Sequence, residues 1–146
     1  VSPYSNWKEK DWAIEKYFEL FKNDFFKGYT IIFTGISKDI PNREKFFKMI
    51  DDSSLNIFNL FDWGNLRHMI PIFNQCKFFI GSDSGLMHLA ASTNCKTFAL
   101  FGPTNEIVYG PWGDHKVIKS LNYPAIDDPL NLPVEKVLNI IKKEMG

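Results

Sequence analysis

Apolar positions along the chain recur with two different spacings, which predict helices and strands in alternation. Stretches with three- and four-residue spacing have Lys and Glu between the apolar groups, whereas short β-branched and aromatic runs end in glycine turns. The pattern predicts helices over residues 8–24, 42–50, 65–75, 84–92 and 133–143. It predicts strands over residues 29–34, 55–61, 77–80, 97–101 and 115–118. Residues 102–114 and 121–132 are expected to be loops.

The predicted strands and helices alternate throughout, and this order is typical of a parallel sheet covered by helices. Residues 77–80 are continuously apolar, as expected of a strand that is buried on both faces. Asn65 is expected to cap the third helix, and Pro71 is expected to kink it. The fold class predicted is α/β: a Rossmann-like three-layer sandwich with a mainly parallel sheet.

Composition narrows the class of protein. The chain has 146 residues, which favours one domain, and 45% of them are hydrophobic. There are 17 basic and 17 acidic side chains, so the formal net charge is zero. General nucleic-acid binders carry a basic excess, and we therefore expect no nucleic-acid partner.

Cysteine usage and hydropathy suggest a cytoplasmic protein. Cys76 and Cys95 lack the spacing of a metal site, and we expect a reduced pair. No run approaches the ~20 apolar residues of a membrane helix, and no signal peptide is expected. A chain that opens at Val1 rather than Met is expected to be a fragment or a processed product.

The most informative stretch is the turn at residues 81–85, GSDSG, between a predicted strand and a predicted helix. The first amides of a helix lack partners within the helix and attract negative charge, so this turn predicts an anion site around Ser84, Gly85 and Leu86. His88 follows Ser84 by four residues and is expected on the same helix face. Both side chains can donate hydrogen bonds to phosphate oxygens.

Two further segments are expected to reach the same edge of the sheet. Thr104 follows the next predicted strand and offers a hydroxyl on a tight turn. Residues 5–10 offer Lys10 or Lys8 as a point charge for a diphosphate. Asp83 can only accept hydrogen bonds, so we expect it to hold a ribose hydroxyl, to orient an N–H group, or to cap the helix.

Each of these side chains also has an ordinary structural interpretation. Asp83 or Ser84 can be a simple helix cap that contributes ~1 kcal/mol. His88 can be a core histidine, Lys10 a solvated charge, and Thr104 the closing residue of a Gly-Pro turn. The functional interpretation depends on their combination and on their order along the chain.

Three motifs together resemble glycosyltransferase family 9, the ADP-heptose:lipopolysaccharide heptosyltransferases. They are GSDSGLMHLAA at residues 81–91, LFGPT at residues 100–104 and YGPW at residues 109–112. Lys10-Asp-Trp12 resembles the family's basic residue two positions before a tryptophan. The resemblance spans nearly the whole chain.

The resemblance implies that residues 1–146 form one nucleotide-sugar-binding domain, the carboxyl-terminal half of a GT-B fold, and that an amino-terminal acceptor domain is absent from this chain. It implies an inverting transferase whose base lies in that absent domain, so no catalytic residue is expected here. The donor contacts implied are Ser5, Asn6, Lys10, Asp83, Ser84, Gly85 and His88, to which the residues themselves add Leu86 and Thr104. Asn6 departs from the family's usual hydroxyl, and Asp39 is a weak candidate for the family's acidic residue.

The implied substrates are a nucleotide-sugar, with ADP-heptose the family's best-known donor, and a lipid-linked saccharide acceptor bound through the absent domain. No cofactor or metal is expected, since a lysine and a helix start can do a cation's work. The full enzyme would act in lipopolysaccharide core synthesis, at most peripherally at the inner face of the inner membrane. This polypeptide alone is expected to bind the donor without transferring sugar.

Two other functions stay open from the residues alone. The turn at residues 81–85 has the strand–turn–helix outline of a nucleophile elbow, with Asp83 where serine is usual. An α/β hydrolase of this kind would need a distant histidine, and His115 is the only one downstream. The third possibility is a non-catalytic ligand-binding or docking domain.

Overall fold

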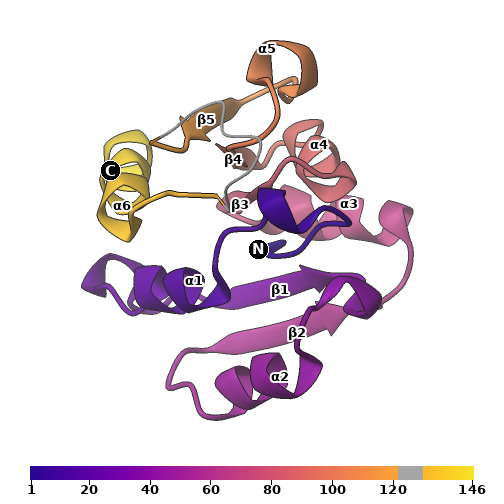
Figure 1. Ribbon diagram of the computed structural model, residues 1–146, viewed down its shortest axis with the longest axis vertical. Helices are drawn as coiled ribbons and strands as arrows, with labels where there is room; N and C mark the ends of the chain where they lie inside the picture. Colours follow the sequence, from indigo (N-terminus) through magenta and orange to yellow (C-terminus); the bar gives the residue numbers. More distant parts are fainter. Residues whose placement is uncertain (122–129) are drawn as a thin grey trace.

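The computed structural model describes residues 1–121 and 130–146, which alternate between strands and helices (Figure 1). The strands are β1 (Ile31–Gly35), β2 (Ile57–Phe61), β3 (Phe78–Ser82), β4 (Lys96–Phe101) and β5 (His115–Lys119). The α-helices are α1 (Ile14–Phe21), α2 (Arg43–Asp51), α3 (Leu66–Gln75), α4 (Gly85–Ala91), α5 (Glu106–Tyr109) and α6 (Val134–Met145). Short 3₁₀ turns lie at Lys8–Lys10, Asp24–Phe26 and Ser37–Asp39.

All strand pairs are parallel, and they form two groups joined by the start of the chain. β1 pairs with β2, and β4 lies between β3 and β5. The amide of Thr34 donates to the carbonyl of Val1 at 2.9 Å, and the amide of Ser2 donates to that of Ile80 at 3.2 Å. The first residues therefore lie between β1 and β3. The resulting spatial order is that of a doubly wound Rossmann sheet, whose switch point lies between the first residues and β3.

Helices cover both faces of this sheet, as the predicted three-layer sandwich requires. On β4, Phe98 and Leu100 belong to a core cluster that includes α1 and α6, whereas Ala99 and Phe101 belong to a cluster with α3 and α4. Successive side chains of a strand point to opposite faces, so β4 is buried on both. The fold class predicted from the sequence is confirmed.

The capped helices were predicted well because their signals are local. Asn65 accepts a hydrogen bond from the amide of Arg67 at 2.9 Å, and Asn42 accepts one from the amide of Lys45 at 3.0 Å. α3 runs through Pro71 without a break. Val137 and Ile141 are fully buried on α6, as its apolar stripe predicts.

The helix predicted over residues 8–24 is too long. Lys8–Lys10 form a 3₁₀ turn, Asp11 is extended, and α1 begins only at Ile14. Asp11 has extended backbone and bonds back to Ser5, while Trp12 is fully buried with its indole nitrogen donating to the carbonyl of Leu132 at 2.8 Å. These tertiary bonds override the helical spacing.

The predicted loop over residues 102–114 contains the short helix α5, capped by Asn105. In the predicted loop over residues 121–132, residues 122–129 lie outside the described part, and Leu130 and Leu132 are buried. Among the described residues, no helix is both long enough and apolar enough to span a bilayer.

Candidate functional site

A cavity of about 610 Å³ opens at the switch point of the sheet. The start of the chain, the ends of β1 and β2 and the start of α4 line it together. Five of the predicted site residues lie in its wall: Ser5, Asn6, Ser84, Gly85 and Leu86. Asp39, the weak acidic candidate, lies there too. In open parallel sheets ligands bind at this position, so the cavity is the leading candidate site.

The other predicted residues meet around one carboxylate beside this cavity. Asp83 directly follows β3 and is only 6% exposed. Its Oδ2 accepts hydrogen bonds from Lys10 Nζ and Thr104 Oγ1, both at 3.0 Å. His88 Nε2 lies 3.5 Å from Oδ1. Asp83 thus holds the side-chain donors of Lys10 and Thr104, Ser84 takes the cap position, and a contact of Asp83 with a ribose hydroxyl stays a prediction.

α4 begins immediately after this carboxylate. Ser84 is its N-cap and accepts a hydrogen bond from the amide of Met87 at 3.3 Å. A hydroxyl that accepts one bond still has its own proton to donate. Gly85 and Leu86 follow, and first-turn amides have no acceptor within their helix. Ser84 is thus a structural cap that retains a donor toward the cavity.

His88 lies at the surface, not in the core. Its side chain is 43% exposed while it contacts the buried Asp83. Lys10 is more enclosed, and its Nζ also lies 5.3 Å from the centre of the Trp7 ring. An ammonium has three protons, so Lys10 can bind Asp83 and still donate to a ligand.

The loop that carries Ser5 and Lys10 is closed by Asp11. Oδ1 of Asp11 lies 2.8 Å from both the amide nitrogen and Oγ of Ser5. Burial raises the pKa of Asp11 to about 6, although the two bonds from Ser5 oppose the shift. The resemblance gave Asp11 no role, and no pattern in the residues marks it, because its partner is set by the turn.

Other residues of the cavity wall were also missed by sequence reasoning. Asp62, Trp63 and Lys38 line the cavity from the turns after β2 and β1. Asp62 has a positive φ of 59° and accepts a hydrogen bond from the amide of Ser37 at 2.8 Å. The sequence offered one signal for these residues, which is that they follow two predicted strands. The carboxyl ends of neighbouring parallel strands lie at the same edge of the sheet.

The site offers hydrogen-bond donors, positive charge and apolar surface in one place. Ser84 in the cavity wall, and Lys10 and His88 at the neighbouring Asp83, can donate to anionic oxygens, while Trp63 and Leu66 offer apolar contact in the cavity. Among the described residues, no cluster of three or more His, Cys, Asp or Glu is placed to hold a metal ion. The arrangement suits an anion joined to a flat or apolar group.

The geometry does not fit the hydrolase hypothesis. Asp83 is buried and engaged by three side chains. His115 begins β5 and pairs with Thr97, whereas Ser82 at the end of β3 pairs with Leu100. Thr97 and Leu100 are three residues apart on β4, so their partners His115 and Ser82 are about 10 Å apart along the strand direction. His115 and Asp83 therefore lie at opposite ends of their strands.

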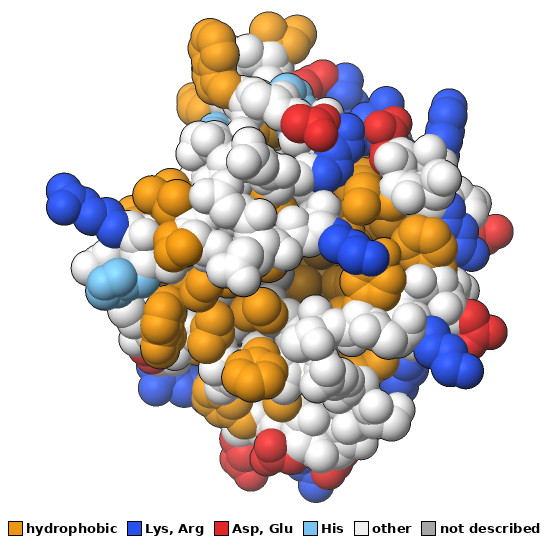
Figure 2. Space-filling model, turned by 180° about the vertical axis from the view of Figure 1, so that it is seen from behind, with side chains coloured by type: hydrophobic (Ala, Val, Ile, Leu, Met, Phe, Trp, Pro, Cys, Tyr) orange, Lys and Arg blue, Asp and Glu red, His pale blue; other side chains and the backbone are white. Residues whose placement is uncertain are grey.

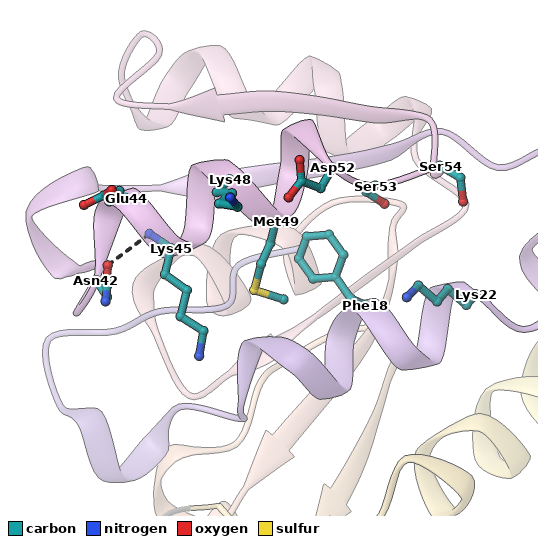
Figure 3. A pocket seen from close by; sticks show the side chains of 10 residues that line it. All are labelled: Phe18, Lys22, Asn42, Glu44, Lys45, Lys48, Met49, Asp52, Ser53 and Ser54. Carbon is teal, nitrogen blue, oxygen red and sulfur yellow. Dashed lines mark hydrogen bonds between the residues drawn. The ribbon is translucent and has the colours of Figure 1, made fainter.

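A second cavity of about 620 Å³ lies between α1 and α2 (Figure 3). Phe18 and Met49 form its apolar floor, and lysines and carboxylates alternate around it. It contains none of the predicted site residues. Its mixed charge offers no specific preference for a ligand.

α5 and the residues after it expose large apolar side chains, which project from the top of the molecule (Figure 2). Ile107 is 87% exposed and Trp112 is 86% exposed. Exposed apolar patches mark interaction surfaces. This surface is compatible with the docking hypothesis.

Comparison with known proteins places the chain among transferases. The model of glycosyltransferase family 9 (heptosyltransferase) matches residues 1–130. Lipooligosaccharide heptosyltransferase 2 of Haemophilus influenzae is 30% identical over 110 residues, covering 75% of this chain and 32% of that protein. Lipopolysaccharide heptosyltransferase 2 of Escherichia coli is 30% identical over 97 residues, covering 66% of this chain and 28% of that protein.

Solved structures have the same fold. A glycosyl transferase family 9 protein from Veillonella parvula superposes with a TM-score of 0.81 at 21% identity, covering 99% of this chain and 44% of that one. E. coli heptosyltransferase WaaC with ADP gives 0.79 at 20% identity, covering 97% of this chain and 42% of that one. The chain spans about a third of the length of the curated relatives it matches.

Proposed function

Because the chain belongs to glycosyltransferase family 9, we propose that it forms the part of a glycosyltransferase that binds the sugar-nucleotide donor. The proposed donor is ADP-heptose, and the proposed reaction is transfer of heptose to a lipid-linked saccharide acceptor in lipopolysaccharide core synthesis. Residues 1–146 act as one nucleotide-sugar-binding domain in this proposal. The acceptor site and the base that activates the acceptor lie outside it.

One observation carries the proposal. Residues that are distant in the sequence, Ser5 and Ser84 among them, line one cavity at the switch point. Beside it, Asp83 holds Lys10 and Thr104 and contacts His88. A diphosphate needs several hydrogen-bond donors and positive charge at one place, and this part of the fold offers both.

The proposed binding mode assigns the two ends of the cavity to the two ends of the nucleotide. The diphosphate accepts hydrogen bonds from the amides of Gly85 and Leu86, from the Ser84 hydroxyl and from Lys10. Asp39 accepts a bond from a ribose hydroxyl, and the base contacts Trp63.

In this proposal a base outside residues 1–146 takes the proton of an acceptor hydroxyl, whose oxygen bonds to the anomeric carbon on the side opposite the diphosphate and so inverts that carbon. As the bond from that carbon to the diphosphate breaks, negative charge grows on the departing diphosphate oxygen. Lys10 and His88 are placed to stabilise this charge, so the proposed transfer requires no metal. Because the acceptor is lipid-linked, the full enzyme would work at the membrane surface. The chain alone would bind donor without transferring sugar.

Isothermal titration of the chain with ADP, UDP and GDP tests the proposal. We expect ADP to bind more tightly than UDP or GDP, with unchanged affinity in EDTA. Saturating ADP at ~100 times its Kd would add ~2.7 kcal/mol to the free energy of unfolding. Absence of binding by all three nucleotides contradicts the proposal, and a rise in stability only with a protein partner supports the docking hypothesis instead.

A further inference from the structure

Asp11 closes the loop that carries two of the proposed donor contacts. Its Oδ1 lies 2.8 Å from the amide nitrogen of Ser5 and 2.8 Å from Oγ of the same residue. The amide and the hydroxyl of Ser5 can both donate, so Oδ1 of Asp11 joins the start of the loop to its end. Ser5 lines the cavity, and Lys10 precedes Asp11 directly.

The end of the loop is held by two further groups of contacts. Lys10 and Asp11 donate their amides to the carbonyls of Trp7 and Lys8, each at 3.0 Å, which forms the 3₁₀ turn. Trp12 anchors the chain beyond it through its bond to Leu132. The Ser5 hydroxyl has one proton and two acceptors within 2.8 Å, Oδ1 of Asp11 and the carbonyl oxygen of Trp7, and it accepts from the amide of Trp7 at 3.2 Å. With the end fixed, the bonds to Asp11 therefore act together with those to Trp7 in setting where Ser5 stands relative to Lys10.

We propose that Asp11 is a positioning residue of the donor site, whose ionised carboxylate holds Ser5 and Lys10 at the spacing that the diphosphate requires. This inference rests on the proposed function, because Ser5 and Lys10 matter only if the donor binds there. Asp11 acts through Ser5 and does not itself line the switch-point cavity.

Holding this carboxylate ionised is costly for the fold. Asp11 is half-buried, its Oδ2 has no hydrogen-bond partner among the described residues, and burial raises its pKa to about 6. The acidic groups of Glu9 and Asp39 raise that pKa further. Tyr4 and Tyr17 also face it, and Lys8, Glu15 and Lys45 share an adjoining cavity with it. A group kept where its charged form is disfavoured is typical of a functional position.

The proposal predicts opposite pH trends for binding and for stability. The ionised carboxylate accepts charge-assisted bonds from Ser5, which are stronger than neutral ones, so donor affinity is expected to rise as Asp11 ionises. The same ionisation lowers the stability of the fold, because the pKa is raised by burial. A residue with only a structural role would move both quantities in the same direction.

The test measures the Kd of ADP by calorimetry from pH 5 to pH 8 for the chain and for Asp11→Asn. Asn keeps an acceptor oxygen but carries no charge. We expect the ratio of the two Kd values to be near one at pH 5 and roughly fivefold at pH 8, with the weaker binding in Asp11→Asn. The titration of ADP occurs in both measurements and cancels in the ratio. A ratio that stays flat overturns the inference.

Two further variants make the result specific. Glu19→Gln removes an exposed carboxylate of α1 and is expected to give a flat ratio near one. In a Ser5→Ala background, the pH-dependent effect of Asp11→Asn is expected to shrink, because the hydroxyl bond is lost and only the bond from the backbone amide of residue 5 remains. If the unaltered chain fails to bind ADP at any pH, the proposed function fails. If it binds and the Asp11→Asn ratio is flat, this inference alone fails.

Discussion

The ammonium of Lys10 lies 3.0 Å from Oδ2 of Asp83, which joins a loop near the start of the chain to a turn 73 residues later. Both partners are largely enclosed, with side chains 17% and 8% exposed. The pair bridges the first segment of the chain and β3, which flank the switch point. It therefore fixes a cation at the place where the fold leaves room for a ligand.

Replacing Lys10 by Ala is expected to weaken ADP binding about 10- to 100-fold, because a hydrogen bond from a charged donor contributes ~1.5–3 kcal/mol. Calorimetry measures the change. Lys48→Ala is the matched control, since Lys48 is an exposed lysine beside the α1–α2 cavity. Equal losses in the two variants would mean that ADP responds only to net charge.

Asp83→Asn tests whether the carboxylate organises its neighbours. The amide side chain has nearly the same shape but cannot hold Lys10 as an ion pair, so we expect ADP affinity to fall ~10-fold. A double-mutant cycle with Lys10→Ala measures the coupling, which is expected to be ~0.5–3 kcal/mol for residues in contact. Additive effects in that cycle would show that Asp83 and Lys10 act independently on the ligand.

The parts of the fold that sequence reasoning predicted well depend on neighbours in the chain. Asn65, Asn42 and Ser84 cap helices within three residues of themselves, and such signals are visible in any one sequence. The strand role of the first residues was missed, because Val1 and Ser2 bond to β1 and β3 far along the chain. Two residues are too few to show the alternation of a strand, so the sequence gives no local signal for this pairing.

The site residues divide in the same way, into those with a local signal in the sequence and those without one. The turn at residues 81–85 was recognisable because its glycines and hydroxyls stand together, and residues 5–10 offered Lys10 or Lys8, to which the family resemblance added Ser5 and Asn6. Asp11 and Trp63 were missed because their importance arises from tertiary placement. The 3₁₀ turn at Lys8–Lys10 and the extended backbone of Asp11, which the helical spacing did not predict, bring Asp11 to Ser5.

His88→Ala is expected to weaken ADP binding by ~1–3 kcal/mol if the imidazole makes a charge-assisted contact with the diphosphate. His115→Ala is the control, because His115 begins β5 and its Nδ1 lies 2.8 Å from the carbonyl oxygen of Gly113. Titrations at one pH compare the two variants directly. An unchanged Kd in His88→Ala would remove this residue from the binding site.

The stability of the chain is expected to depend on pH through Asp11. Its pKa is raised from 3.8 to about 6 by burial, so the folded state binds more protons than the unfolded state between these values. Its contribution is therefore fully present below pH ~4 and is lost as pH rises through ~6. Urea denaturation of the chain and of Asp11→Asn at several pH values measures the difference. The free energy of unfolding of the unaltered chain, minus that of Asp11→Asn, is expected to fall as pH rises through ~6. A rise in this quantity with pH would contradict the interpretation.

Two substitutions at Ser84 separate its role as a helix cap from its proposed contact with the donor. Ser84→Ala removes both the cap and the hydroxyl, and an N-cap loss costs ~1 kcal/mol of stability. Ser84→Gly also removes the hydroxyl, but glycine at an N-cap costs only a few tenths of a kcal/mol. We expect the two variants to differ in urea midpoint and to share a roughly fivefold loss of ADP affinity, the size of one net hydrogen bond. If affinity instead followed stability, with Ser84→Gly binding like the unaltered chain, the hydroxyl would serve α4 alone and the diphosphate would depend on Lys10 and the first amides of the helix.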